Sequence, residues 1–214
     1  MATISGRSAL KSREMLSIDN VVYVGNHGLD RWRGGHLEVL KEAKEYSAVI
    51  QRLVERLNHD LDMSELIIEA KGLSASVHYR LSHEPLRARE TILRIIGDIP
   101  EAQGLLVTEG KLVVEVLPPV GVDKGTSLRQ LVMEYGLKGV VFLGDDVTDV
   151  DAFRSLHDIS STGDCRGLAL GVLGPNTPPE IEQNADLFLR DVPEVEELLQ
   201  RMAEAFPDTV SAAC

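Results

Sequence analysis

The chain has 214 residues, 43% of them hydrophobic, which is enough for one large domain or two small ones with a buried core. Its 34 acidic residues outnumber 22 basic ones, and the net charge of −12 argues against nucleic acid or an anionic membrane as a partner. The only cysteines, Cys165 and Cys214, lie far apart, and no apolar stretch reaches membrane-spanning length. The sequence therefore predicts a soluble, cytoplasmic protein.

The first 28 residues contain two short strand-like segments. Residues 1–4 lead directly into Ser5-Gly6-Arg7 and a helical pattern over residues 10–16. Residues 21–24 predict a short buried strand that ends in a turn at residues 25–28. Because only three residues separate Met1 from Ser5, we expect the chain to begin inside a structural element.

The middle of the chain predicts a compact inserted domain. Residues 37–61 carry apolar side chains at helical spacing, and two short strand-like stretches follow at residues 66–70 and 73–81. Pro85 opens a second helix, and the strands at residues 105–108 and 112–116 flank a turn at Glu109-Gly110. The expected order is αββαββ.

After residue 118 the pattern alternates between helix and strand. This alternation predicts a parallel sheet covered by helices. The helices are expected at residues 127–135, 151–156, 180–184 and 195–205, and the strands at residues 140–143, 168–172 and 186–189.

An acidic cluster follows the apolar run of residues 140–143. Asp145, Asp146, Asp149 and Asp151 place four carboxylates within seven residues, which repel one another unless a cation or specific donors offset them. The cluster lies past the carboxyl end of a predicted parallel strand, where open α/β sheets bind ligands. Oxygen ligands of this kind suit Mg2+. The alternative is a solvated acidic turn with Asp149 as the N-cap of the next helix.

Six motifs follow one another along the chain: Ser5-Gly6-Arg7, Gly25-Asn26-His27-Gly28, Glu69-Ala70-Lys71-Gly72, His78-Tyr79-Arg80, Asp123-Lys124-Gly125 and the run from Gly144 to Phe153. This ordered set resembles the motifs of the trehalose-6-phosphate phosphatases, a family of the haloacid-dehalogenase-like superfamily. The resemblance implies an α/β fold with a Rossmann-like parallel-sheet core and an inserted αββαββ cap. The core would comprise residues 1–28 and 119–214, and the cap residues 29–118.

The resemblance also implies roles for residues that bind phosphate and metal. Ser5, Gly6, Arg7 and Lys124 would bind phosphate, with Ser5 and Lys124 in catalytic roles; without its context, Lys124 would be interpreted as a surface lysine. Asp145 and Asp149 would bind Mg2+, with Asp146 as an alternative ligand. A metal ion and a lysine suit phosphoryl transfer, because catalysis there is mostly positioning and charge neutralisation. Val150 stands where the family usually has an acid.

Six further residues match family positions that would read the sugar. The implied substrate is trehalose 6-phosphate, and a trehalose-6-phosphate synthase is a possible partner. The alternatives are a sheet face open to water for the charged residues, and structural roles for the turn asparagine and histidine. The six residues are Asn26, His27, Glu69, Lys71, Arg80 and Glu115.

One family motif is missing from the sequence. The Asp-x-Asp-Gly-Thr segment, which in this family supplies the nucleophile and the acid–base aspartate on the first core strand, does not occur in the 214 residues. We therefore expect an inactive, truncated chain that lacks the first strand, rather than an evolved loss of catalysis. Two other hypotheses remain open: a different capped sugar phosphatase, and a non-catalytic sugar-phosphate-binding or regulatory fragment of a synthase–phosphatase.

Overall fold

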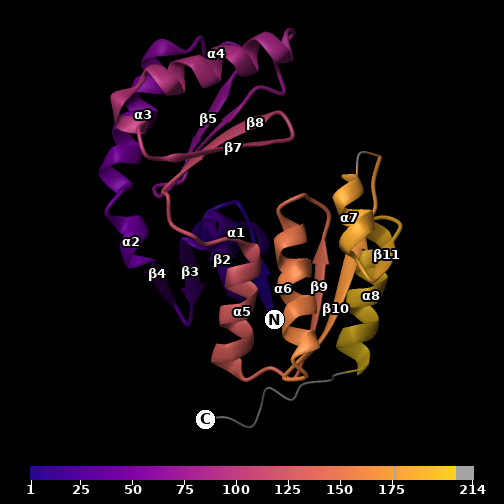
Figure 1. Ribbon diagram of the computed structural model, residues 1–214. Coiled ribbons are helices and arrows are strands. Elements are labelled where there is room, and N and C mark those ends of the chain that lie inside the picture. Colours follow the sequence, from indigo (N-terminus) through magenta and orange to yellow (C-terminus); the bar gives the residue numbers. More distant parts are fainter. Residues whose placement is uncertain (176, 206–214) are drawn as a thin grey trace. The chain divides into compact units, whose positions relative to one another are not determined.

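A computed structural model describes residues 1–175 and 177–205, so Cys214 lies outside the described residues. The chain divides into two compact units, Met1–Val122 and Asp123–Cys214 (Figure 1). Both units combine helices with sheets that contain parallel strands, which confirms the predicted α/β class. Within the described ranges, no helix is long and apolar enough to cross a membrane.

The first sheet of unit Met1–Val122 brings the start of the chain beside the turn at residues 25–28. Strand β1 pairs in parallel with β2, and β3 and β4 continue the sheet in antiparallel fashion. Buried Tyr23 packs with Ala9 and Val21 beneath helix α1. The elements are β1 (Ala2–Ile4), α1 (Ala9–Leu16), β2 (Val22–Gly25), the 3-10 turn η1 (Asn26–Gly28), β3 (Asp30–Arg33) and β4 (His36–Val39).

The predicted helix over residues 37–61 is wrong at its beginning. Residues His36–Val39 form β4 and pair with β3 across a turn at Gly34 and Gly35, which both adopt positive φ. The helical part is limited to α2 (Lys41–Lys44) and α3 (Ser47–Asp60). The glycine pair is the turn signal that separates the two strands.

A second sheet in the same unit has the predicted αββαββ order. Helices α3 and α4 (Pro85–Asp98) cover one face of the antiparallel sheet β5-β6-β8-β7, where Leu53, Leu57 and Ile92 pack against Val77 and Val114 (Figure 1). The strands are β5 (Ile67–Ala70), β6 (Ala75–His78), β7 (Leu106–Gly110) and β8 (Val113–Leu117), and the 3-10 turn η2 (Pro100–Ala102) follows α4.

The predicted turn at Glu109-Gly110 is displaced in the structure. Both residues belong to β7, and the reversal occurs at Lys111 and Leu112, where Leu112 takes a φ of 57°. The cap bounds of residues 29–118 stay a prediction.

The unit Asp123–Cys214 holds the predicted parallel sheet, in the order β11-β10-β9. Its core joins Val150 and Phe153 to Ala169 and Ile181, and the Phe153 ring meets Phe142 edge-on at 5.9 Å. The strands are β9 (Gly139–Gly144), β10 (Arg166–Val172) and β11 (Leu187–Leu189), and the helices are α5 (Lys124–Tyr135), α6 (Asp149–Ser161), α7 (Pro179–Asn184) and α8 (Val192–Ala205).

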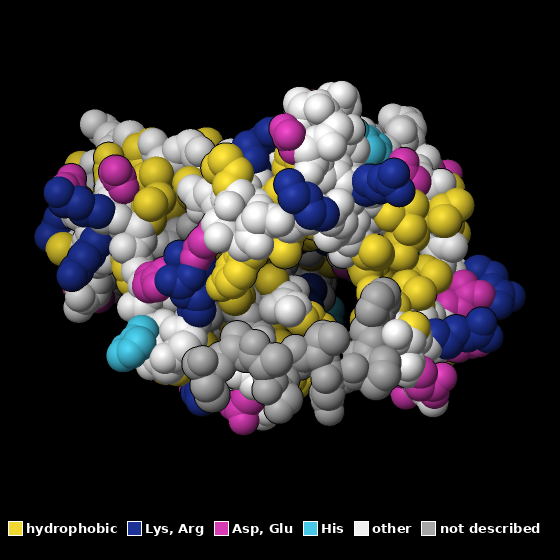
Figure 2. All heavy atoms as spheres, turned by 90° about the horizontal axis from the view of Figure 1, so that it is seen from below, with side chains coloured by type: hydrophobic (Ala, Val, Ile, Leu, Met, Phe, Trp, Pro, Cys, Tyr) yellow, Lys and Arg dark blue, Asp and Glu magenta, His cyan; other side chains and the backbone are white. Residues whose placement is uncertain are grey.

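The surface mixes both signs of charge. Figure 2 shows basic and acidic side chains interspersed with hydrophobic ones over the face in view. Many of the charges pair within single helices, for example Arg56 with Asp60 and Arg201 with Glu197.

Candidate functional site

The loop of residues 5–7 joins the end of β1 to the beginning of α1. Ser5 continues the pairing with β2 through its N–H, which donates to Val24 O at 2.9 Å. The Arg7 N–H donates to Ser5 Oγ at 3.1 Å, so the hydroxyl proton stays available to a ligand. Ser8 caps α1 by accepting the Lys11 N–H. A hydroxyl, an arginine and a helix N-terminus form a suitable setting for a phosphate group.

Asn26 and His27, in the 3-10 turn η1 that follows β2, hold this loop. Both residues adopt the left-handed conformation, with φ of 49° and 59°. Their N–H groups donate to Arg7 O and Ser5 O, at 2.7 and 3.0 Å. Such backbone conformations are costly for residues other than glycine and persist only where the surroundings hold them. The motif at residues 25–28 is therefore part of the loop's support.

The face of the second sheet opposite α3 and α4 carries a row of polar side chains. Glu69, Ser76, Glu115 and Thr108 lie directly opposite one another on β5, β6, β8 and β7. Residues opposite in register share a face, and the adjacent positions pack under the helices. We call these four residues the polar row. They present carboxylates and hydroxyls, the groups that bind sugar hydroxyls.

Lys71 connects the polar row to the loop of residues 5–7. It lies one residue past the end of β5, and its Nζ donates to Glu115 Oε1 and to Gly6 O, each at 2.9 Å. The Lys71 side chain is 6% exposed and that of Glu115 is 17% exposed. Ser76 also donates to Glu115 Oε1, at 2.9 Å. Four of the residues predicted from sequence, Gly6, His27, Lys71 and Glu115, thus meet in one cluster.

His27 completes this cluster from the side of the loop. Its Nε2 lies 3.2 Å from Glu115 Oε2 as an ion-pair contact, although the ring N–H is not aligned for a hydrogen bond. Although burial opposes it, the contacts with His27 and Lys71 hold the pKa of Glu115 well below its usual range. A Cβ at Gly6 would lie 2.7 Å from His27 Nε2, so a side chain there would displace the His27 ring.

Arg80 belongs to a second polar group on the same sheet. Its Nη2 lies 3.0 Å from His78 Nδ1, and His78 Nε2 lies 3.4 Å from Glu69 Oε2. His78 therefore joins two residues that the sequence assigned to sugar binding. Arg80 is exposed and free to turn toward a ligand.

In unit Asp123–Cys214, Lys124 and Asp149 form a buried ion pair. Asp123 caps α5 by accepting the Thr126 N–H at 2.6 Å, which makes Lys124 the first helical residue. The Lys124 Nζ donates to Asp149 Oδ1 at 2.7 Å, and the two side chains are 9% and 6% exposed. Asp149 Oδ2 accepts the N–H groups of Asp145 and Asp146. Asp149 thus fixes the conformation of residues 145–149, which we call the acidic loop, through these hydrogen bonds.

Two glycines make this arrangement possible. A Cβ at Gly125 would lie 2.4 Å from Asp151 O, so only glycine lets the start of α5 approach the start of α6. A Cβ at Gly144 would lie 2.4 Å from Asp149 Cβ. Both glycines were part of the sequence motifs, and their role is close packing rather than turn formation.

The profile of the trehalose-phosphatase family matches residues 1–173, which is most of the chain. The chain belongs to the trehalose-phosphatase family. It is similar to trehalose-phosphate phosphatase B of Arabidopsis thaliana, with 28% identity over 95% of the chain and 56% of that protein. The chain spans about half the length of the curated relatives it matches.

Solved structures agree on the fold of this trehalose-phosphatase family chain. A trehalose-6-phosphate phosphatase related protein superposes with a TM-score of 0.76 at 23% identity, over 95% of this chain and 80% of that one. A haloacid dehalogenase-like hydrolase from Bacteroides thetaiotaomicron gives a TM-score of 0.62 at 15% identity, over 94% and 85%. The predicted haloacid-dehalogenase-like fold is confirmed.

The metal ion implied by the trehalose-phosphatase family can be tested against the acidic loop. The described residues contain no cluster of three or more His, Cys, Asp or Glu side chains arranged to hold an ion. Both Asp149 oxygens are already engaged. Asp145, in contrast, is an exposed residue whose carboxyl group is partly desolvated, and this desolvation, together with the charges of Asp149 and Asp146, raises its pKa. A cation would offset that repulsion, so Asp145 fits Mg2+ best.

Sequence reasoning missed several residues that complete the site. Ser76 and Thr108 belong to the polar row, and His78 lies between Glu69 and Arg80. His78 stood inside a quoted motif, so a signal for it existed. The two hydroxyl residues carry no local signal, because only strand register places them beside Glu115.

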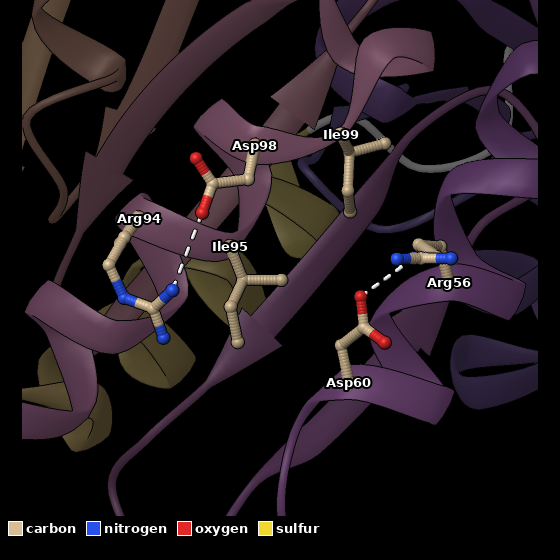
Figure 3. Close-up of a pocket in the computed structure, with 6 residues that line it drawn as sticks. All are labelled: Arg56, Asp60, Arg94, Ile95, Asp98 and Ile99. Carbon is tan, nitrogen blue, oxygen red and sulfur yellow. Dashed lines mark hydrogen bonds and ion pairs between the residues drawn. The ribbon is translucent and has the colours of Figure 1, made fainter.

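One surface pocket of this trehalose-phosphatase family chain lies away from these residues. Figure 3 shows it between α3 and α4, with Ile95 and Ile99 beside two pairs of charged side chains. Arg56 pairs with Asp60 at 2.7 Å and Arg94 with Asp98 at 3.3 Å. These helices cover the face of the sheet opposite the polar row, so we do not assign the pocket to the site.

Proposed function

We propose that this chain provides the substrate-binding and metal-binding parts of a Mg2+-dependent phosphatase that acts on trehalose 6-phosphate in the cytoplasm. The observation that carries the proposal is the contact of Lys71 with both Glu115 and Gly6. It joins the polar row to the loop of residues 5–7 within one compact unit. A ligand with a sugar at one end and a phosphate at the other matches that juxtaposition.

The loop of residues 5–7 would bind the phosphate group. The Ser5 hydroxyl and the Arg7 guanidinium donate to phosphate oxygens, and the positive end of the α1 dipole favours the anion. Arginine suits this role because its planar guanidinium can donate two hydrogen bonds to one phosphate.

The polar row and its neighbours would read the disaccharide. Glu69 and Glu115 accept hydrogen bonds from sugar hydroxyls, and Lys71 and Arg80 donate them. A site built in this way discriminates strongly, because a sugar that lacks a matching hydroxyl leaves a polar side chain without a partner. His27 and Asn26 support the phosphate side of the same site.

The residues of unit Asp123–Cys214 would supply positive charge to offset the negative charge of the phosphoryl group during its transfer. Asp145 would hold Mg2+, with Asp146 as a second ligand and Asp149 orienting the loop. A Mg2+ ion held there would supply positive charge for phosphoryl transfer. Lys124, fixed by Asp149, adds a positive charge of defined orientation.

Covalent hydrolysis through a phosphoaspartate would require the Asp-x-Asp-Gly-Thr segment, which the 214 residues do not contain. We therefore expect this chain to bind the substrate without hydrolysing it. A chain that carries the segment ahead of Ser5 would supply the attacking carboxylate. A trehalose-6-phosphate synthase, whose product is this substrate, is the proposed functional partner.

Isothermal titration of the 214-residue chain with trehalose 6-phosphate and with glucose 6-phosphate tests the proposal. We expect trehalose 6-phosphate to bind at least about tenfold more tightly, because the second glucose adds hydrogen bonds to the polar row. Glu69→Gln should reduce that preference, while Glu109→Gln, an exposed glutamate of β7, should not. Equal affinity for both ligands, or phosphate release by the chain with Mg2+, would contradict the proposal.

A further inference from the structure

Asp30 is a buried carboxylate that the proposed binding site does not use. It begins β3 and is 6% exposed. Its Oδ1 accepts the Ala9 N–H at 3.1 Å, at the start of α1, and its Oδ2 accepts Asn26 Nδ2 at 3.0 Å. Burial raises the pKa of this carboxyl. Burying a carboxylate costs free energy of folding unless it is hydrogen-bonded, so the two hydrogen bonds of Asp30 indicate a structural role.

Asn26 links this carboxylate to two separate segments. The side chain of Asn26 is fully buried. Its Nδ2 also lies 3.4 Å from Lys71 O, and its Oδ1 accepts the Ser74 hydroxyl at 2.7 Å. Its backbone N–H donates to Arg7 O. One residue therefore bonds to both segments: its backbone N–H to the loop of residues 5–7, and its side chain to the turn at residues 71–74, which leads from β5 to β6.

The backbone at Gly25 packs closely against this pair and the beginning of α1. A Cβ at Gly25 would lie 2.0 Å from Ala9 N and 2.4 Å from Asp30 Oδ1. The absence of a side chain at Gly25 is what lets the Asp30 carboxylate reach the beginning of α1. Buried polar groups that are fully bonded in this way fix one geometry, because any shift would leave a donor unpaired.

We propose that Asp30, acting through Asn26, is a positioning residue that holds the loop of residues 5–7 at a set distance from the turn at residues 71–74. The inference deepens the proposed function and rests on it. The loop would bind the phosphate and the turn carries Lys71, so the pair sets the spacing between the phosphate and the sugar of a single ligand. Asp30 itself does not touch the ligand.

The substitution Asp30→Asn tests the coupling without changing the size of the side chain. It replaces one acceptor oxygen by an NH2 group, so either Ala9 N–H or Asn26 Nδ2 loses its partner. Affinity for trehalose 6-phosphate, which spans both segments, should fall about tenfold, as expected when reacting groups are misplaced by a small distance. Affinity for trehalose, which would contact the polar row only, should change less than about twofold. Asp19→Asn, on an exposed aspartate, is the matched control.

Exchanging the two residues provides a rescue experiment. In the double substitution Asn26→Asp with Asp30→Asn, an amide at position 30 can accept from Ala9 N–H and donate to a carboxylate at position 26. That carboxylate can still accept the Ser74 hydroxyl. The double variant loses the donor to Lys71 O but keeps the bonds to Ala9 N–H and to the Ser74 hydroxyl, so it should recover part of the affinity lost by Asp30→Asn. A role in general stability would not predict this reciprocal recovery.

Amide hydrogen exchange separates this inference from the proposed function. Asp30→Asn should speed exchange in both residues 5–9 and residues 71–74, relative to the core strand β6. If the unchanged chain binds no trehalose 6-phosphate, the proposed function fails and exchange alone decides the positioning role. If Asp30→Asn does not fold, Ser74→Ala carries the same exchange test at the other end of the network. Unchanged exchange in both segments, equal loss for both ligands, or no recovery in the double variant would overturn the inference.

Discussion

Lys124 and Asp149 occupy the first positions of two neighbouring helices, and their side chains meet at 2.7 Å. The sequence assigned them to phosphate and to metal. The structure shows that the two side chains bind each other and that both are almost fully buried. The pair therefore has a structural role in the acidic loop before it has any role toward a ligand.

Breaking this pair should strongly destabilise the unit Asp123–Cys214. Lys124→Met leaves the Asp149 carboxylate buried without its counter-ion, and Asp149→Asn leaves the lysine in the same condition. Removing one partner of a buried ion pair costs about 3–5 kcal/mol, so each single variant should lose that much. The double variant should lose less than the sum. Chemical unfolding of the four proteins measures the coupling, and strictly additive losses would show that the pair is not coupled.

Two glycine-to-alanine substitutions should have opposite effects. Gly125 faces the backbone of α6 at a distance that excludes a Cβ, whereas a Cβ at Gly97 in α4 has open space around it. Gly97→Ala should stabilise the protein by about 0.5–1 kcal/mol, because alanine favours the helix. Gly125→Ala should destabilise it by about 1–3 kcal/mol, through forced separation of α5 from α6. Thermal unfolding decides; a rise in Tm for both variants would refute the close-packing role of Gly125.

Much of the fold could be predicted from local sequence patterns. In the helices and strands of the second sheet and of the parallel sheet, hydrophobic residues recur with the spacing typical of a helix or a strand. The order of these elements could therefore be predicted from the sequence. The β3–β4 hairpin was missed, because Trp32 is the only apolar residue in β3, which is too few to give a recognisable strand pattern. Only the Gly34-Gly35 turn indicated it.

The candidate site could be predicted as a set of residues but not as a set of contacts. Glu115 and Lys71 are separated by 44 positions in the chain, and their hydrogen bond depends on the register of β5, β6 and β8. No local pattern fixes that register. The engagement of Asp149 by Lys124 likewise depends on how two helices pack, which is why the sequence suggested only a metal ligand.

Magnesium binding should depend on Asp145 more than on its neighbours. Asp145 has an exposed carboxylate whose charge is disfavoured by Asp146 and Asp149, and a divalent cation would relieve that repulsion. Asp145→Asn should weaken Mg2+ binding at least about tenfold, since Mg2+ is held by only one or two carboxylates in such sites. Asp158→Asn, on the exposed side of α6, should leave it unchanged. Calorimetric titration with MgCl2 measures both, and equal affinities would exclude Asp145 as a ligand.

The Lys71–Glu115 pair should make the stability of unit Met1–Val122 depend on pH. In the folded state the pKa of Glu115 is lowered from its ordinary value of 4.5. Above pH 4.5 the carboxylate is charged in both folded and unfolded chains, and its full stabilisation is present. As the pH falls below that value, the unfolded chain takes up a proton before the folded chain does, so the stabilisation is progressively lost.

Glu115→Gln should therefore cost about 3 kcal/mol at pH 7, because Lys71 would remain buried without a counter-ion. The difference in unfolding free energy between the unchanged chain and this variant should shrink steadily from pH 4.5 to lower pH, the range set by the lowered pKa of Glu115. Glu109→Gln, which removes an exposed partner of Arg89, should cause a much smaller change at every pH. Urea titrations at a series of pH values provide the comparison. A difference that stays constant on acidification would show that Glu115 is not held as a charged group by Lys71 and His27.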